Sequence, residues 1–138
     1  MNDTLLLDTD VASFLFKNSP HARPFRPLLK GKGLALAFVS VAELFKWAVK
    51  RGWSPAKVAQ LETSLRRHVI IPYDRDLAWA WARLVAACEG AGRPIAPSDA
   101  WVAAASLRHD VTLVTNNLKH FEAAASLCGL KLLRPQSP

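Results

Sequence analysis

Short, largely apolar runs alternate along the chain with longer segments of helical periodicity, and this alternation constrains the fold more than any other feature. The apolar runs cover residues 4–7, 34–39, 69–71, 111–114 and 130–133. Strands that are apolar on both faces are typical of a parallel sheet covered by helices on both sides. The pattern therefore predicts one doubly wound α/β domain over residues 1–138, with a central parallel sheet of four to five strands.

Helices are predicted from apolar residues at three- and four-residue spacing and from capping residues. They cover residues 11–17, 41–51, 54–67, about 74–90, 98–109 and 121–128. Ser40 and Glu43 form the S-x-x-E pattern of a capping box, and Ser98 is a candidate N-cap. The segment that contains Pro20, Pro24 and Pro27 is predicted to be a loop.

The charge of the chain is strongly basic and unevenly distributed. Eighteen Lys and Arg residues against eleven Asp and Glu give a net charge of +7, with a pI of about 9.9. Residues 11–73 hold eleven of the bases and only two of the acids. Isolated acids in a basic body suit a polyanionic partner gathered around a carboxylate site. A soluble basic protein that never meets nucleic acid has the same composition, so both interpretations stay open.

Nothing in the chain predicts secretion or membrane insertion. The longest uncharged apolar stretch, residues 33–42, is about half of the ~20 residues that a membrane span requires. The acidic start does not resemble a signal peptide. Cys88 and Cys128 lack metal-ligand spacing and are expected to be reduced thiols. We therefore expect a cytoplasmic protein.

Several acids and polar residues fall next to strand ends, where parallel α/β sheets bind their ligands. Asp8 and Asp10 follow the first predicted strand, Glu43 lies in the first turn after the second, and Asp99 opens a later helix. Thr115 and Asn117 follow the fourth strand. Each of these acids also has a structural explanation, as a capping box, a helix-dipole partner or an Asx turn. Those explanations do not account for their gathering at one end of the sheet.

Clustered carboxylates predict a hard divalent cation. Two of them ~4 Å apart repel by ~4 kcal/mol at an effective dielectric of about 20, so three or four need a cation or added protons. Oxygen ligands favour Mg²⁺ or Mn²⁺ over zinc, and the four histidines show no ligand spacing. Such a site suits hydrolysis of a phosphodiester.

Four segments resemble the signature motifs of PIN-domain ribonucleases, above all the toxins of VapBC-type toxin–antitoxin pairs. They read LLLDTD (5–10), VSVAEL (39–44), PSDAWVAA (97–104) and TLVTNNLKHFE (112–122), and the resemblance extends over residues 4–133. It implies a PIN-like fold, Mg²⁺- or Mn²⁺-dependent cleavage of single-stranded or looped RNA, a homodimer and a cognate antitoxin protein. It also implies that Asp8, Glu43 and Asp99 bind the metal and that Thr115 is the family's small hydroxyl residue.

Two positions depart from the commoner family pattern. Asn117 stands where many relatives carry an acid, and Asp10 stands where many carry Asn or Ser. An amide oxygen at 117 still ligates a metal or holds water, but it adds no charge. We hypothesise that Asp10 restores the charge that Asn117 lacks, so that the number of acids in the site stays the same.

Basic and aromatic residues follow Glu43 along the same predicted helix and form a candidate RNA-binding face. They are Lys46, Trp47, Lys50 and Arg51, with Trp53 just beyond. A solvated basic face with a half-buried tryptophan explains the same pattern. A second basic stretch, for substrate or antitoxin, comprises Lys17, Arg23, Arg26, Lys30 and Lys32. His120 is expected to be a plain surface histidine, although its place near Asn117 leaves proton transfer open.

Two other functions fit parts of the sequence. The segment from Asp8 to Asp10 also resembles the opening motif of haloacid-dehalogenase-type phosphatases, with Asp8 as the nucleophile. That interpretation leaves Glu43 without a role and finds no second acid beside Asp99. The other alternative is a PIN-like module that binds RNA or protein without cutting, and only the amide at Asn117 supports it.

Overall fold

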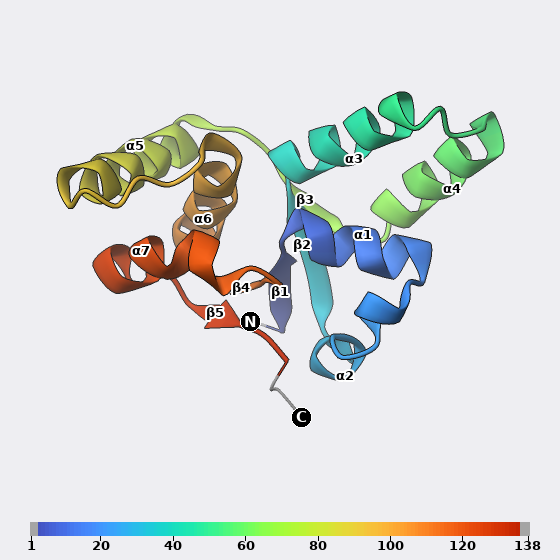
Figure 1. The fold of residues 1–138 in the computed structure, drawn as a ribbon, viewed down its shortest axis with the longest axis horizontal. Helices are drawn as coiled ribbons and strands as arrows, with labels where there is room; N and C mark the ends of the chain where they lie inside the picture. The colour runs from blue at the N-terminus through green and yellow to red at the C-terminus, as the bar shows by residue number, and fades with distance from the viewer. Residues whose placement is uncertain (1–2, 136–138) are drawn as a thin grey trace.

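A five-stranded parallel sheet forms the centre of the protein (Figure 1). The computed structural model describes residues 3–135; residues 1–2 and 136–138 of the predicted domain lie outside this range. The strands are β1 (Thr4–Leu7), β2 (Gly33–Ala37), β3 (Val69–Ile71), β4 (Thr112–Val114) and β5 (Leu132–Leu133). Their order is β3-β2-β1-β4-β5, with every neighbouring pair parallel. The predicted parallel α/β sheet is confirmed, with five strands.

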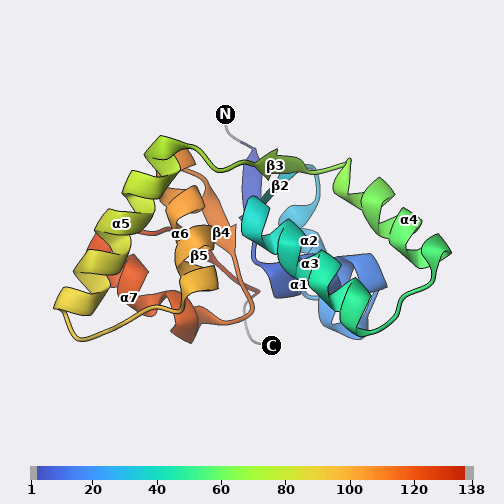
Figure 2. The ribbon, with the colours of Figure 1, turned by 90° about the horizontal axis from the view of Figure 1, so that it is seen from above.

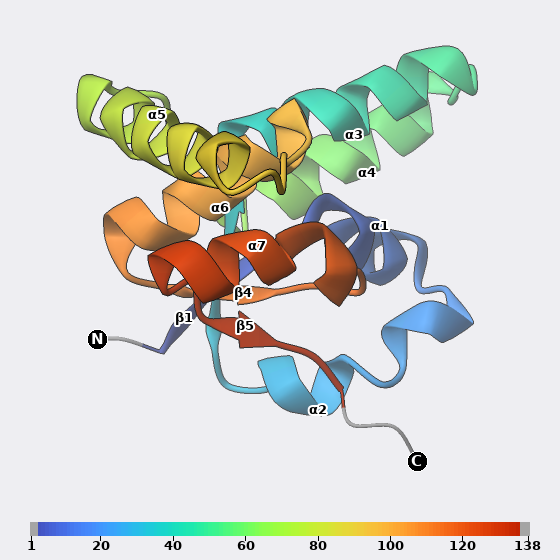
Figure 3. The ribbon, with the colours of Figure 1, turned by 60° about the vertical axis from the view of Figure 1, so that its left-hand side comes forward.

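The helices form two groups, one on each face of the sheet (Figures 1 and 2). The first group is α1 (Thr9–Lys17), α2 (Arg26–Leu29), α3 (Phe38–Lys50) and α4 (Pro55–Leu65). The second is α5 (Arg75–Gly90), α6 (Pro97–His109) and α7 (Leu118–Cys128). Figure 3 shows α7 alongside the edge formed by β4 and β5. Within residues 3–135, no helix combines the length and apolar character needed to cross a membrane.

Side chains that alternate along the strands build a separate core on each face, because successive residues of a strand point to opposite sides. Leu6 and Leu113 pack with α5, α6 and α7, together with the fully buried Phe121. Leu7 and Val114 pack on the other face against α1, α3 and α4. The strands are therefore apolar throughout, as the sequence pattern indicated.

The neighbouring strands β1 and β4 mark the point where the winding of the sheet reverses direction. From β1 it builds outward through β2 to β3, then crosses over and adds β4 and β5 on the other side of β1. In such doubly wound sheets the crevice beyond the carboxyl ends of the two central strands is where ligands bind. The topology therefore assigns the site to the ends of β1 and β4.

Several predicted element boundaries are wrong. The proline-containing segment predicted as a loop holds a 3-10 turn, η1 (Pro20–Ala22), and the short helix α2. α1 begins at Thr9, two residues earlier than predicted, because Asp8 is its N-cap. α7 begins at Leu118, three residues early, which places His120 in its first turn.

Two of the predicted serine caps, Ser40 and Ser98, are also wrong. α3 begins at Phe38 with Ala37 as its N-cap, and α6 begins at Pro97 with Ala96 as its N-cap. Neither N-cap makes a side-chain hydrogen bond. Ser40 and Ser98 are therefore inside the helices, where their hydroxyls are available for contacts with other parts of the chain.

Candidate active site

Asp8 and Thr115 join the ends of the two central strands. Asp8 follows β1 and is buried, and its Oδ1 accepts a hydrogen bond from the Thr9 backbone N–H at 2.9 Å. Thr115 follows β4 and is fully buried, and its Oγ1 donates to Asp8 Oδ2 at 2.9 Å. The Thr115 hydroxyl also accepts from the backbone N–H of Asn117 at 2.9 Å. The carboxylate is thus held by donors from both strand ends.

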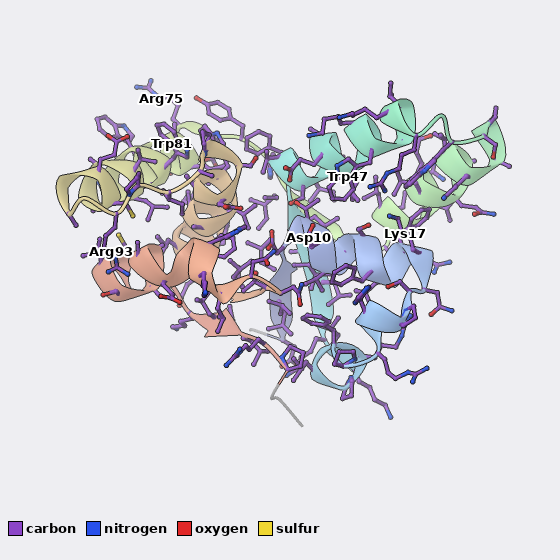
Figure 4. The ribbon with its side chains drawn as sticks, in the orientation of Figure 1. Asp10, Lys17, Trp47, Arg75, Trp81 and Arg93 are labelled. Atoms are coloured by element: carbon purple, nitrogen blue, oxygen red, sulfur yellow. The ribbon has the colours of Figure 1, made fainter. Side chains whose placement is uncertain are left out.

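A pocket of about 200 Å³ opens beside this pair. We call it the acid pocket. Its lining residues are Asp8, Thr9, Asp10, Glu43, Trp47, Ala96, Ser98, Asp99, Asn117 and His120. Figure 4 shows Asp10 near the centre of the molecule, between the two groups of helices. The structure therefore brings together all four predicted acids and Asn117, with Thr115 directly behind Asp8.

Three hydroxyls that were not predicted as site residues form a hydrogen-bond network with Glu43, two of them by direct contact. Thr9 Oγ1 lies 2.7 Å from Glu43 Oε1 and 2.7 Å from Ser40 Oγ. Ser98 Oγ donates to Glu43 Oε2 at 3.3 Å. A hydroxyl donates one hydrogen bond and can also accept. The Thr9 and Ser40 hydroxyls can therefore form one hydrogen bond with each other and a second with the Glu43 carboxylate. Glu43 of α3 is consequently oriented by hydroxyls from two other helices, α1 and α6. The capping-box interpretation of Ser40 and Glu43 is wrong, because the N-cap of α3 is Ala37.

Burial raises the pKa of Asp8 to about 6, because desolvation disfavours the charged form. The hydrogen bonds from Thr115 and Thr9 oppose this rise, whereas the charges of Asp10 and Asp99 add to it. A pKa near 6 in a buried carboxylate is typical of a functional site.

Asp99 has a raised pKa for the same reason, burial first, with the charges of Glu43 and Asp10 adding to it. His120 opposes this rise: its Nδ1 lies 3.4 Å from Asp99 Oδ2. His120 is exposed, as expected for a surface histidine, but it also lines the acid pocket and contacts Asp99, which the sequence did not predict. The early start of α7 explains the difference, since it places this ring in the first turn of a helix next to the pocket.

Asp10 and Asn117 contact each other directly across the pocket. Asn117 Nδ2 donates to Asp10 Oδ2 at 3.0 Å. The two residues are 107 positions apart in sequence, so only the junction of β1 and β4 brings them together. The amide thus leaves one Asp10 oxygen outside this hydrogen bond and keeps its own carbonyl oxygen available.

The donor set of the acid pocket fits a hard divalent cation in its chemistry. It offers carboxylate, hydroxyl and amide oxygens and no thiolate. Over residues 3–135, however, no three His, Cys, Asp or Glu side chains converge on a point where one ion would contact them all. Asp8, Glu43 and Asp99 are each turned instead toward a hydroxyl, amide or imidazole donor.

The predicted RNA-binding residues divide into two sets. Trp47 is half-buried and lines the acid pocket, and the Arg51 guanidinium carbon lies 5.5 Å from the centroid of its ring. Lys46 and Lys50 are exposed on α3 and are not among the residues that line the pocket. Only one half of the predicted face therefore adjoins the site.

Comparison with known proteins agrees with this architecture. The family model named PIN domain matches residues 5–127. Ribonuclease VapC1 of Haemophilus influenzae is 27% identical, covering 88% of this chain and 92% of the relative. VapC ribonuclease Y4jK of Sinorhizobium fredii is 30% identical, covering 97% and 99%. DNA-bound VapBC from Salmonella typhimurium contains a chain with a TM-score of 0.78 and 25% identity, covering 99% of this chain and 100% of that one. The chain therefore belongs to the PIN domain family and, within it, to the VapC ribonucleases.

Proposed function

We propose that this protein is a metal-dependent endoribonuclease that cuts single-stranded or looped RNA and acts as the toxin of a type II toxin–antitoxin pair. The observation that carries the proposal is the acid pocket, which Asp8, Glu43 and Asp99 all line at the topological switch of a PIN fold. The VapC relatives are named as ribonucleases, which supports the reaction class.

Asp8, Glu43 and Asp99 would hold Mg²⁺ or Mn²⁺, with Asp10 and Asn117 contributing directly or through water. When bound, the cation would offset the carboxylate charge and activate water for attack on the phosphodiester. The residues of the chain prepare the site for this. Thr115 and the Thr9 N–H orient Asp8, and the Thr9 and Ser98 hydroxyls fix both oxygens of Glu43. Fixed ligands cost less reorganisation when the substrate arrives.

RNA would approach along α3. Trp47 forms part of the pocket wall and Arg51 lies against its indole. This arrangement suits a single RNA strand whose bases stack on an aromatic ring while a cation neutralises its phosphates. Lys46 and Lys50 would add phosphate contacts from the exposed side of the same helix.

The remaining expectations also belong to this proposal. We infer one domain that acts in the cytoplasm, as a homodimer, under the control of a cognate antitoxin protein. The resemblance to VapBC toxins and the similar chain in the VapBC complex from Salmonella typhimurium support the antitoxin partner.

A cleavage assay tests the proposal. The purified protein with Mn²⁺ or Mg²⁺ should cut RNA internally, and EDTA should stop the reaction. Asp8→Asn, purified in parallel, should lose the activity while keeping its fold by circular dichroism. Cutting that survives in EDTA or in Asp8→Asn would show that the activity does not come from the acid pocket.

The same assay addresses the two alternatives. Membership of the PIN family and the position of Glu43 beside Asp8 favour a nuclease over a phosphatase with Asp8 as nucleophile. A phosphatase would instead be trapped at Asp8 by fluoroberyllate. RNA binding without cleavage in either metal would identify a non-catalytic module.

A further inference from the structure

Three cations from two parts of the chain gather where α1 and α3 end and α4 begins. They are Lys17, Arg51 and Lys57, and we call this cluster the basic junction. Phe16 of α1 stacks on Trp53, which lies between α3 and α4, with ring centroids 5.7 Å apart. The Lys57 ammonium lies 4.1 Å from the centroid of the Trp53 ring. The aromatic contact thus fixes both the approach of α1 and the position of Lys57.

The basic junction carries positive charge that no acid compensates. Among residues 3–135, none of its three members takes part in an ion pair. The pKa of Lys17 is lowered, first by partial burial and then by the charges of Arg51 and Lys57, so both cations lie close enough to Lys17 to repel its ammonium group. Concentrated positive charge held on an aromatic platform is typical of a surface that binds a polyanion.

The basic junction is continuous with the acid pocket. Trp47 lines the pocket and contacts Arg51, which belongs to the basic junction. On the opposite side, α1 runs from Asp10 beside the pocket to Lys17, and seven helical residues span about 10 Å. Figure 4 shows Asp10 and Lys17 toward opposite ends of α1, with Trp47 on α3 between them. A nucleic-acid strand that leaves the pocket along this seam meets the basic junction next.

We propose that the basic junction is a second RNA-contact site, which binds backbone phosphates of the substrate strand a few nucleotides from the bond held in the acid pocket. The proposal rests on the proposed ribonuclease function and specifies that the bound RNA runs from the acid pocket toward the basic junction. Lys17 and Lys57 supply phosphate contacts, and Trp53 positions Lys57 rather than reading a base. Binding here is independent of sequence, because phosphates carry no base information.

Salt-dependent RNA binding tests the proposal. The full chain carrying Asp8→Asn is titrated in EDTA with a labelled single-stranded RNA of about ten nucleotides, a length within the usual site sizes. On a single strand, each neutralised phosphate contributes about 0.7 to the slope of log K against log salt concentration. Adding Lys17→Gln and Lys57→Gln should therefore reduce this slope by about 1.4. A dinucleotide, followed by chemical-shift titration, should bind both proteins equally, because it does not reach beyond the acid pocket.

A charge-matched pair controls for the loss of net charge. Arg75→Gln with Arg93→Gln removes two charges beside α5, on the other side of the molecule (Figure 4), and should leave the slope unchanged. Lys17→Arg with Lys57→Arg should restore it. An unchanged slope in the Lys17/Lys57 variant, or an equal fall in the control pair, would overturn the proposal. Weakened binding of polyglutamate with an unchanged RNA slope would also overturn it and would assign the basic junction to an acidic peptide.

The outcome is separable from that of the proposed function. If the chain with its native acids fails to cut RNA but the slope falls as stated, the basic junction stands as an RNA site and the nuclease proposal fails. If RNA is cut and the slope does not change, only the basic junction is refuted.

Discussion

The buried carboxylate of Asp8 lowers the stability of the folded protein at neutral pH. Its carboxylate is buried at the end of β1 with a pKa of about 6, whereas the same group in an unfolded chain titrates near 3.8. The folded state therefore binds the proton more tightly than the unfolded state, so this group lowers the free energy of unfolding as the pH rises from about 4 to about 6. Above about pH 6 the free energy of unfolding is lowered by the full amount.

We therefore expect Asp8→Asn to stabilise the protein in EDTA at pH 7. The amide is isosteric and uncharged, so the gain approaches about 3 kcal/mol, from a shift of about two pKa units at 1.36 kcal/mol each. Urea unfolding at pH 7 and pH 4.5 measures it, and the difference between the two proteins should shrink at the lower pH. Mn²⁺ should raise the midpoint of the Asp8 protein more than that of the variant. Equal stability at both pH values would contradict the assigned cost of burial.

Thr9 is the residue on which the orientation of Glu43 depends. Thr9→Val keeps the shape of the side chain but removes the hydroxyl shared by Ser40 and Glu43. Because Ser40 is fully buried, its hydroxyl loses its partner, at a cost of about 1–3 kcal/mol. We also expect RNA cleavage to fall about 10–100-fold, as for other residues that orient metal ligands. Thr9→Ser retains the hydroxyl and should retain most activity, so similar rates for the two variants would argue against the network.

Asp10 and Asn117 allow the charge-compensation hypothesis to be tested by exchange. Asp10→Asn alone should weaken Mn²⁺ binding, measured by calorimetry, because the acid pocket loses one carboxylate. Asp10→Asn combined with Asn117→Asp keeps the number of acids and, through the hydrogen bond between the two positions, should recover most of the affinity. A double variant no better than the single one would show that position 10 matters by itself and not as a substitute for an acid at 117.

At the level of the elements, helix starts decide which side chains are free for the site. α5 begins with an ordinary cap: Asp74 accepts from the Leu77 N–H at 2.7 Å. α3 and α6 begin without one, at Ala37 and Ala96. The serines that local sequence rules assign as caps are in these two cases turned toward Glu43 or Thr9. Local capping chemistry therefore predicts the start of α5 correctly and fails at α3 and α6, whose serines contact Glu43 or Thr9 instead.

The cap of α5 gives a test with a matched control. Asp74→Ala removes the capping bond and the Asp74–Arg108 ion pair, and it should lower the free energy of unfolding by about 1 kcal/mol. Asp74→Asn keeps an acceptor at the N-cap and should cost much less, because an exposed ion pair contributes little. Denaturant unfolding measures the free energy of unfolding of both variants, and an equal loss in the two would contradict this expectation. RNA cleavage should be unaffected by either change.

At the scale of the whole molecule, the core of the second helix group determines whether the acid pocket forms. Phe121 of α7 is fully buried in the core that the sheet forms with α5 and α6. The same helix carries His120. Phe121→Ala should cost about 3–5 kcal/mol, a large share of the 5–15 kcal/mol typical of a domain. Leu127→Ala, on the same helix but 42% exposed, should cost far less. Thermal unfolding of both variants tests this, and similar melting temperatures would contradict the assigned core.

The amino-acid sequence by itself determined the order of strands and helices, the parallel sheet and the acids at strand ends. These features depend on apolar periodicity and on polar residues next to strands, which are local properties of the chain. The tertiary structure alone decided that Thr9 and Ser98 contact Glu43 and that Ser40 contacts Thr9. It also decided that His120 reaches Asp99 and that Lys17 lies near Lys57. Those contacts join residues from different helices, and their energies depend on burial and on distances that only the packed chain fixes. For the same reason, the sequence predicted caps where tertiary contacts needed free hydroxyls.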